Sequence, residues 1–219
     1  MADLPSDRLH QAAPAHGRAA QRSRDIVDPQ VLAAMAEVPR HEFVPPWFRE
    51  SAYEDCPLPL ADGQTISQPY IVALMTQLAR PQPHSRALEV GVGSGYQSAI
   101  LSRLCRHVFG VEIVAGLAHS AQERLARLGY HNITVRLGDG TAGWPEEAPF
   151  DIILVAAAPP RIPPALIDQL APGGRLVLPV GNFQQVLLRI EKLPDGQLEQ
   201  QAITPVSFVP MTGAIQRSS

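Results

Sequence analysis

The chain has 219 residues, of which 45% are hydrophobic and 18% charged, and its formal net charge is −3. This length suits one large domain or two small ones, and the apolar content excludes a wholly disordered chain. A nucleic-acid partner is disfavoured, because such binding usually leaves a strongly basic footprint. No apolar run reaches the roughly 18 residues of a membrane-spanning helix, and no apolar secretion signal opens the chain. We therefore expect a cytoplasmic protein that binds neither nucleic acid nor membrane.

Proline placement organises the N-terminal part of the chain. Asp28-Pro29 predicts the start of a helix, which Pro39 would end. Several prolines between residues 39 and 62 exclude a long helix or a central strand there, so this segment should lie over a core built elsewhere. A second helix is expected near 68–80, where apolar residues recur at helical spacing.

From residue 86 onward, strand-like runs alternate with helical patterns. The expected strands are 87–91, 107–113, 132–140, 150–158 and 175–181, and the helices between them are 96–106, 115–128 and 163–171. A turn then joins strand 185–192 to a last strand through Val206 and Phe208. This pattern predicts an α/β protein with a Rossmann-like, mainly parallel sheet, helices on both faces and a C-terminal antiparallel hairpin.

The same patterns predict the domain organisation. Residues 1–24 are polar and unpatterned, and we expect a disordered N-terminal tail there. Residues 25–219 would form a single domain, in which a helical and looped cap at 25–85 covers a ligand-binding sheet at 86–219.

The strongest chemical signal is the segment Glu89-Val90-Gly91-Val92-Gly93-Ser94-Gly95, where a strand feeds a helix. Glycines there let the backbone turn tightly and approach a ligand at the carboxyl edge of the sheet. The spacing is G-x-G-x-G rather than the G-x-G-x-x-G of dinucleotide sites, and Glu89 would repel a pyrophosphate but suit a cationic amine or sulfonium. Glu112 ends the next strand, 21 residues after Gly91, where a ribose-binding carboxylate belongs.

This combination resembles the S-adenosylmethionine loop of the Rossmann-like class I methyltransferases. The resemblance implies S-adenosyl-L-methionine as the cofactor, and the residues expected to bind it are Glu89, Gly91, Gly93, Ser94, Gly95 and Glu112. In that superfamily an acid at the position of Asp139 accepts the adenine amino group, so Asp139 and Gly140 are further candidates. Two alternatives stay open: Asp139 as a turn aspartate, and Glu89 as a buried acid paired locally.

Longer segments narrow the family. The most specific is Gln64-Thr65-Ile66-Ser67-Gln68-Pro69-Tyr70, and further matches are VPRHEFVP at 38–45, AAPP at 157–160 and VSFVP at 206–210. Over about residues 26–212, the chain resembles bacterial protein-L-isoaspartate O-methyltransferases. The resemblance implies methyl transfer to the α-carboxylate of L-isoaspartyl residues in damaged proteins. The methyl ester then collapses to a succinimide, which hydrolyses partly to normal aspartate and so repairs the protein.

The resemblance also implies a substrate site. Ser67 would be the catalytic residue whose hydroxyl orients the substrate carboxylate, with Thr65 and Ile66 as neighbouring substrate-binding residues. From spacing alone, Ser67 or Gln68 lies where the cap of the helix that Pro69 opens belongs, and spacing favours this capping role for Ser67. Isoaspartyl peptides and proteins of unrelated sequence must be read through their main chain, so we expect strand-like pairing along Val206, Phe208 and Val209. The alternative for that segment is an ordinary edge strand.

Other functions stay open on the sequence alone. They are a methyltransferase for a small molecule or nucleic acid, a non-catalytic S-adenosylmethionine-binding fold and, more distantly, a nicotinamide dehydrogenase. Ala157-Ala158-Pro159-Pro160 lacks the Asn or Asp that precedes Pro-Pro in amino-group nucleic-acid methylases. The histidines and the two cysteines show no metal-ligand spacing, so no metal is expected.

Overall fold

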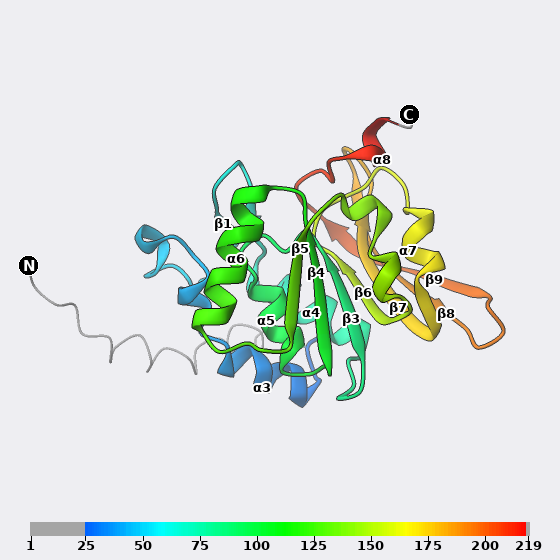
Figure 1. Ribbon diagram of the computed structural model, residues 1–219, viewed down its shortest axis with the longest axis horizontal. Coiled ribbons are helices and arrows are strands. Elements are labelled where there is room, and N and C mark those ends of the chain that lie inside the picture. The colour runs from blue at the N-terminus through cyan, green and yellow to red at the C-terminus, as the bar shows by residue number, and fades with distance from the viewer. Residues whose placement is uncertain (1–24, 218–219) are drawn as a thin grey trace, which may run out of the picture.

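A seven-stranded sheet forms the centre of the computed structural model, which describes residues 25–217 (Figure 1). The strand order is β5-β4-β3-β6-β7-β8-β9. Strands β3 to β7 pair in parallel, and the last two strands pair antiparallel at one edge. The predicted α/β class and the closing hairpin are therefore confirmed. The predicted tail at residues 1–24 lies outside the described residues.

The elements have the following bounds. The strands are β1 (Leu58–Pro59), β2 (Thr65–Ile66), β3 (Arg86–Val90), β4 (His107–Glu112), β5 (Ile133–Leu137), β6 (Phe150–Val155), β7 (Leu170–Val180), β8 (Gln185–Lys192) and β9 (Leu198–Val206). The α-helices are α3 (Pro29–Glu37), α4 (Pro69–Ala79), α5 (Tyr96–Ser102), α6 (Ala115–Arg127), α7 (Pro164–Asp168) and α8 (Ala214–Arg217). The 3-10 turns are η1 (Arg40–Glu42), η2 (Pro46–Phe48), η3 (Gly140–Ala142) and η4 (Pro145–Glu147).

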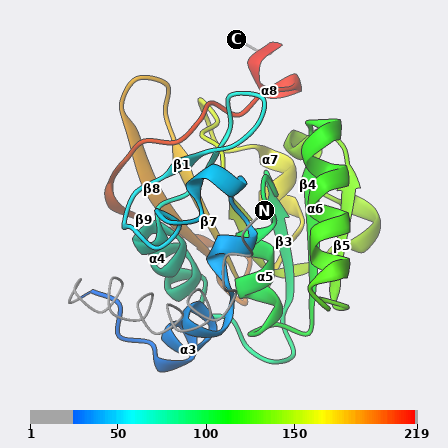
Figure 2. The same cartoon turned by 90° about the vertical axis from the view of Figure 1, so that its left-hand side faces the viewer.

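The sheet separates two apolar cores. Along β3, Ala87 faces the core beneath α4, α5 and α6, whereas Leu88 and Val90 face the core beneath α7 and α8. This alternation is the period of two that a strand imposes on its side chains. In Figure 2, α3 lies below α4 and α5, and its buried residues belong to the first core. The N-terminal segment therefore extends that core rather than forming one of its own. Among residues 25–217, no helix is long and apolar enough to cross a membrane.

Several predicted boundaries are wrong, and the strand expected at 150–158 ends at Val155. Helix α5 ends at Ser102 instead of 106, in a tight turn where the N–H groups of Leu104 and Cys105 both donate to the carbonyl of Leu101. Strand β7 begins at Leu170, inside the helix expected at 163–171, because Leu170 already pairs with Phe150 of β6.

The last predicted strand is also shorter than expected. Strand β9 ends at Val206, so Phe208 lies outside it. The segment that follows is held by hydrogen bonds between the Gln185 side chain and the Phe208 main chain, and by an isolated parallel bridge between Ala158 and Pro210. Periodicity does not encode such long-range contacts.

Candidate active site

The glycine loop connects β3 to α5 in a conformation that side chains would strain. Gly91, Gly93 and Gly95 have φ angles of +86°, +53° and +85°. Such left-handed values are accessible to glycine at little cost and are rare for other residues. The Gly91 N–H donates to the carbonyl of Val111 on β4 at 2.8 Å, which anchors the loop to the neighbouring strand. Gly91 and Gly93 of this loop line a cavity at the carboxyl edge of the sheet.

Glu112 joins the glycine loop to the end of β4. Its Oε2 accepts a hydrogen bond from the Gly93 N–H at 2.8 Å, and its Oε1 accepts one from the Val114 N–H at 2.9 Å. The side chain is 5% exposed and lines the cavity. Two main-chain donors thus fix the orientation of this carboxylate, whose two oxygens can accept further hydrogen bonds.

Glu89 lies deeper, on the sheet face that α5 covers. Burial raises the pKa of its carboxyl to about 8; a hydrogen bond from the Ser98 hydroxyl opposes this rise, and the nearby Glu112 adds to it. The carboxyl is therefore mostly protonated at neutral pH, and a cation beside it would favour the ionised form. The alternative of a locally paired buried acid is confirmed by the Ser98 contact, while Glu89 also lines the cavity.

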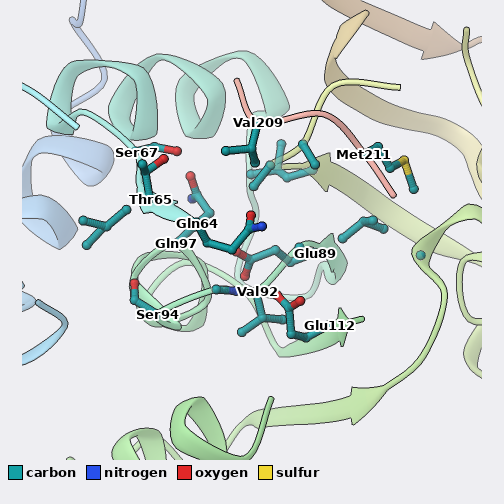
Figure 3. Close-up of a pocket in the computed structure, with 18 of the residues that line it drawn as sticks. Gln64, Thr65, Ser67, Glu89, Val92, Ser94, Gln97, Glu112, Val209 and Met211 are labelled. Atoms are coloured by element: carbon teal, nitrogen blue, oxygen red, sulfur yellow. Dashed lines mark hydrogen bonds between the residues drawn. The ribbon is translucent and has the colours of Figure 1, made fainter. Parts of the chain in front are cut away.

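A second cavity adjoins the first one. It is lined by residues of the β2–α4 connection and of the segment after β9, including Thr65, Ser67, Val206, Phe208 and Val209. Thr65, Ser67, Ala156 and Val209 line both cavities. Figure 3 shows Ser67 and Thr65 on one side of the first cavity and Glu112 on the other, with Glu89 and Gln97 between them.

Ser67 is not the cap of α4. The helix begins at Pro69 with Gln68 at the N-cap position, and no side chain of that position bonds the helix. Instead, Asp55 reaches across from the preceding loop: its Oδ1 accepts from the Tyr70 N–H at 2.9 Å and its Oδ2 from the Gln68 Nε2 at 3.0 Å. Within the described residues the Ser67 hydroxyl makes no hydrogen bond, and it faces the junction of the cavities. The alternative that Ser67 caps the helix is therefore wrong, whereas Gln68, the other candidate, does occupy the N-cap position.

Most predicted site residues lie around these cavities, but two do not. Gly95 lines neither; it caps α5, and a Cβ there would come within 3.3 Å of Leu125 on α6. Asp139 also lines neither, because its Oδ1 accepts from the Thr141 N–H at 2.9 Å and its Oδ2 from the Ala214 N–H at 2.7 Å. Its carboxylate joins η3 to the C-terminal α8, as in the alternative of a turn aspartate. Binding of adenine by Asp139 stays a prediction.

The remaining candidates have varied surroundings. Gly140 lines the first cavity, as do Ile66 and Ser94. The Ser94 hydroxyl accepts a long bond from the Tyr96 N–H at 3.3 Å, and its carbonyl accepts from Arg124 at 2.9 Å. Ser94 therefore stabilises the loop as well as lining it.

Sequence reasoning missed several lining residues. They are Gln64, Gln97, Ile113, Ala156, Ala157, Met211 and Thr212. Ile113 carried a usable signal, because it is an apolar residue directly after Glu112, the acid predicted to bind ribose, and it is 41% exposed at the cavity. Gln97 carried none, since only the fold brings the start of α5 beside α4, where its Nε2 donates to Thr76 at 2.9 Å.

The residues of the first cavity fit S-adenosylmethionine. A positive-φ glycine loop gives the backbone close approach, Glu112 offers a carboxylate to hydroxyl groups, and Glu89 offers a second carboxyl that a cationic group would ionise. The exposed Ile113 adds an apolar surface for a flat ring. Within residues 25–217, no group of three side chains is placed to hold a metal ion.

Comparison with known proteins agrees with this geometry. The family model described as protein-L-isoaspartate(D-aspartate) O-methyltransferase matches residues 18–216. The chain is 55% identical over 192 residues to protein-L-isoaspartate O-methyltransferase 2 of Syntrophobacter fumaroxidans, covering 87% of this chain and 78% of that protein. It is 52% identical over 204 residues to protein-L-isoaspartate O-methyltransferase 1 of Cupriavidus necator, covering 92% of this chain and 79% of the relative.

Solved structures show the same relationship. A structure from Plasmodium falciparum that is assigned to the same enzyme family, in complex with S-adenosyl-L-homocysteine, superposes with a TM-score of 0.81 at 27% identity. The match covers 91% of this chain and 98% of that one. Because the family model and these relatives span nearly all described residues, the chain belongs to the protein-L-isoaspartate(D-aspartate) O-methyltransferase family.

Proposed function

We propose that this chain transfers a methyl group from S-adenosyl-L-methionine to the α-carboxylate of L-isoaspartyl residues in peptides and proteins, with Ser67 orienting the acceptor. The observation that carries the assignment of roles is the junction of the two cavities at Thr65, Ser67, Ala156 and Val209. A donor held by the glycine loop and an acceptor in the second cavity can meet only there. Membership of the family supplies the reaction class.

The acceptor needs no general base. The acceptor is the free α-carboxyl group of the isoaspartyl residue. Such a group has a pKa of about 3.5 and is ionised at neutral pH. When bound, S-adenosyl-L-methionine supplies a sulfonium-activated methyl group; the new bond joins that carbon to the carboxylate oxygen, and the electron pair of the broken bond stays on sulfur. The protein's contribution is to hold the carboxylate in line and exclude water from it.

The Ser67 hydroxyl is suited to that positioning. It is a neutral donor, so it orients the carboxylate while leaving most of the negative charge on the attacking oxygen, whereas a cationic donor would lower its nucleophilicity. The capping role that would otherwise occupy this hydroxyl is supplied by Asp55. Ile66 and Val209 add apolar wall that keeps water away from the reacting oxygen.

Main-chain recognition explains how one site serves many proteins. The segment Val206–Val209 borders the second cavity together with Pro57 and Ile71. Its backbone can pair with an extended peptide as an added strand does, without selecting flanking side chains. The substrates are therefore isoaspartyl sites in flexible or unfolded segments.

The assay uses two peptides of one sequence, with L-isoaspartate or L-aspartate at one position. We expect methyl transfer from labelled S-adenosylmethionine to the isoaspartyl peptide only. Ser67→Ala should lower kcat about 10²-fold, while the affinity for S-adenosylhomocysteine and the Tm stay unchanged, because Ser67 neither caps α4 nor lies in its core. Ser67→Thr retains the hydroxyl and is the matched control.

Two results would contradict the proposal. Equal labelling of both peptides would remove isoaspartate as the acceptor. A parallel loss of activity, cofactor affinity and Tm in Ser67→Ala would show a structural role for the serine instead.

A further inference from the structure

Gln185 lies where the closing hairpin meets the second cavity. It is the first residue of β8 and pairs with Val206, the last residue of β9. Beyond this pair the ladder of main-chain hydrogen bonds stops, and the chain continues as Ser207–Val209 along the cavity. The conformation of that wall is therefore not set by pairing with β8.

The Gln185 side chain continues the ladder by one step. Its Oε1 accepts from the Phe208 N–H at 2.6 Å, and its Nε2 donates to the Phe208 carbonyl at 3.0 Å. One primary amide thus satisfies both main-chain groups of one residue, as a paired strand residue would. Glutamine can do this because its amide carries a donor and an acceptor together, whereas an ionised glutamate only accepts.

The opposite side of the wall is held by Ala158, just after β6. Its N–H donates to the carbonyl of Val209 at 2.8 Å, and its carbonyl accepts from the Met211 N–H at 2.8 Å. In an extended chain, the main-chain N–H and C=O groups of consecutive residues point to opposite sides. Because the groups of Phe208 point towards β8, the groups of Ser207 and Val209 point away from it. Val209 reaches Ala158 there, and Ser207 faces the second cavity.

We propose that Gln185 is a positioning residue for the protein substrate: its amide holds the Ser207–Val209 wall in the strand-like form with which the substrate main chain pairs. The inference rests on the proposed function and goes beyond it, since Gln185 itself lines neither cavity. The Gln185 side chain acts only through its two hydrogen bonds to the Phe208 main chain. Loss of the amide should therefore weaken peptide binding without changing the chemistry at Ser67 or the glycine loop.

The test compares Gln185→Glu with Gln184→Glu, its exposed neighbour. Both variants make the same charge change at adjacent positions, but only Gln185 bonds Phe208. We expect Gln185→Glu to raise the KM for an isoaspartyl peptide about tenfold with kcat within about twofold, which corresponds to the loss of one or two hydrogen bonds. Gln184→Glu should match the wild type, and calorimetry should give both variants the wild-type Kd for S-adenosylhomocysteine. Gln185→Met, which is uncharged, gives the same comparison if Gln185→Glu does not fold.

Each other outcome overturns the inference. Equal KM values for the two glutamate variants would show that Ala158 alone fixes the wall. A loss of cofactor affinity, a fall in kcat without a rise in KM, or unfolding of both Gln185 variants would show a structural role. Failure of the proposed function is distinguishable from failure of this inference. If the wild-type protein does not discriminate isoaspartyl from aspartyl peptide, the proposed function itself is wrong, and this result comes from the wild type before any variant is measured.

Discussion

Glu89 and Glu112 stand on neighbouring strands, yet their carboxyls have different environments. Glu112 accepts hydrogen bonds from the main-chain N–H groups of Gly93, in the glycine loop, and of Val114, just before α6. Glu89 receives one hydroxyl, is 1% exposed, and has a pKa raised to about 8, chiefly by burial. The two acids therefore differ in what governs them: main-chain donors orient Glu112, and burial raises the pKa of Glu89.

Glu89→Gln should reduce the dependence of stability on pH. The folded pKa of about 8 lies above the ordinary 4.5, so the unfolded chain releases a proton that the folded chain retains between these values. The contribution of Glu89 to stability is thus complete below about pH 4.5 and is lost as the pH rises towards about 8. In cofactor-free protein, the Tm of Glu89→Gln should exceed that of wild type most near pH 8. Glu50→Gln at an exposed site is the control, and parallel Tm–pH curves would refute the argument.

Glu112→Gln tests the predicted role of Glu112 and the glycine loop in cofactor binding. A glutamine oxygen can accept only one of the two N–H groups well, and its NH2 group would face the other. We expect the Kd for S-adenosylhomocysteine, measured by calorimetry, to rise at least about tenfold. Glu123→Gln on the exposed face of α6 should leave it unchanged. An unaltered Kd in Glu112→Gln would remove this acid from the site.

At the scale of elements, the start of α4 shows how a distant residue frees a functional one. Pro69 sets the first helical position, but the N–H of Tyr70 is satisfied by Asp55, which lies in the loop before β1. The same carboxylate holds the Gln68 side chain. The hydroxyl of Ser67, directly before this cap, is thereby left for the cavities.

Asp55→Ala should cost about 1 kcal/mol of stability, the usual value of a helix cap, and should also lower kcat because the residues around Ser67 lose their anchor. Urea unfolding and peptide kinetics measure the two effects, and Glu54→Ala at the adjacent exposed acid is the control. The distinguishing feature is the combination: Ser67→Ala lowers kcat without a stability change. If Asp55→Ala leaves both quantities at wild-type values, Asp55 is not the cap.

At the scale of the whole molecule, the N-terminal cap and the sheet share one core. Met35 and Phe43 from the cap belong to the same buried cluster as Ile152 and Val177 from the sheet. The predicted division at residue 85 therefore does not separate two cores. We propose that residues 25–217 unfold as a single cooperative unit.

Met35→Ala tests that unit. This residue is fully buried in the cap, and its truncation should cost about 2–5 kcal/mol. In a Trp47→Phe background, the fluorescence of Trp144, which packs against Phe109 beneath the other face of the sheet, reports on the sheet. We expect the Trp144 transition to shift to the same lower Tm as the calorimetric one. Val27→Ala at a 73% exposed position is the control, and an unshifted Trp144 transition would mean that the cap unfolds alone.

The sequence alone determined the class of fold and the location of the glycine loop, because both depend on local features. Alternating apolar runs define parallel strands, the G-x-G-x-G spacing allows positive φ angles, and the segment from Gln64 to Tyr70 carries the family resemblance. The tertiary structure decided how individual side chains are used. It bonded Asp139 to α8, assigned the cap of α4 to Asp55, raised the pKa of Glu89 by burial and brought Gln185 to Phe208. Each of these depends on contacts between distant residues and on burial, which neither spacing nor periodicity encodes.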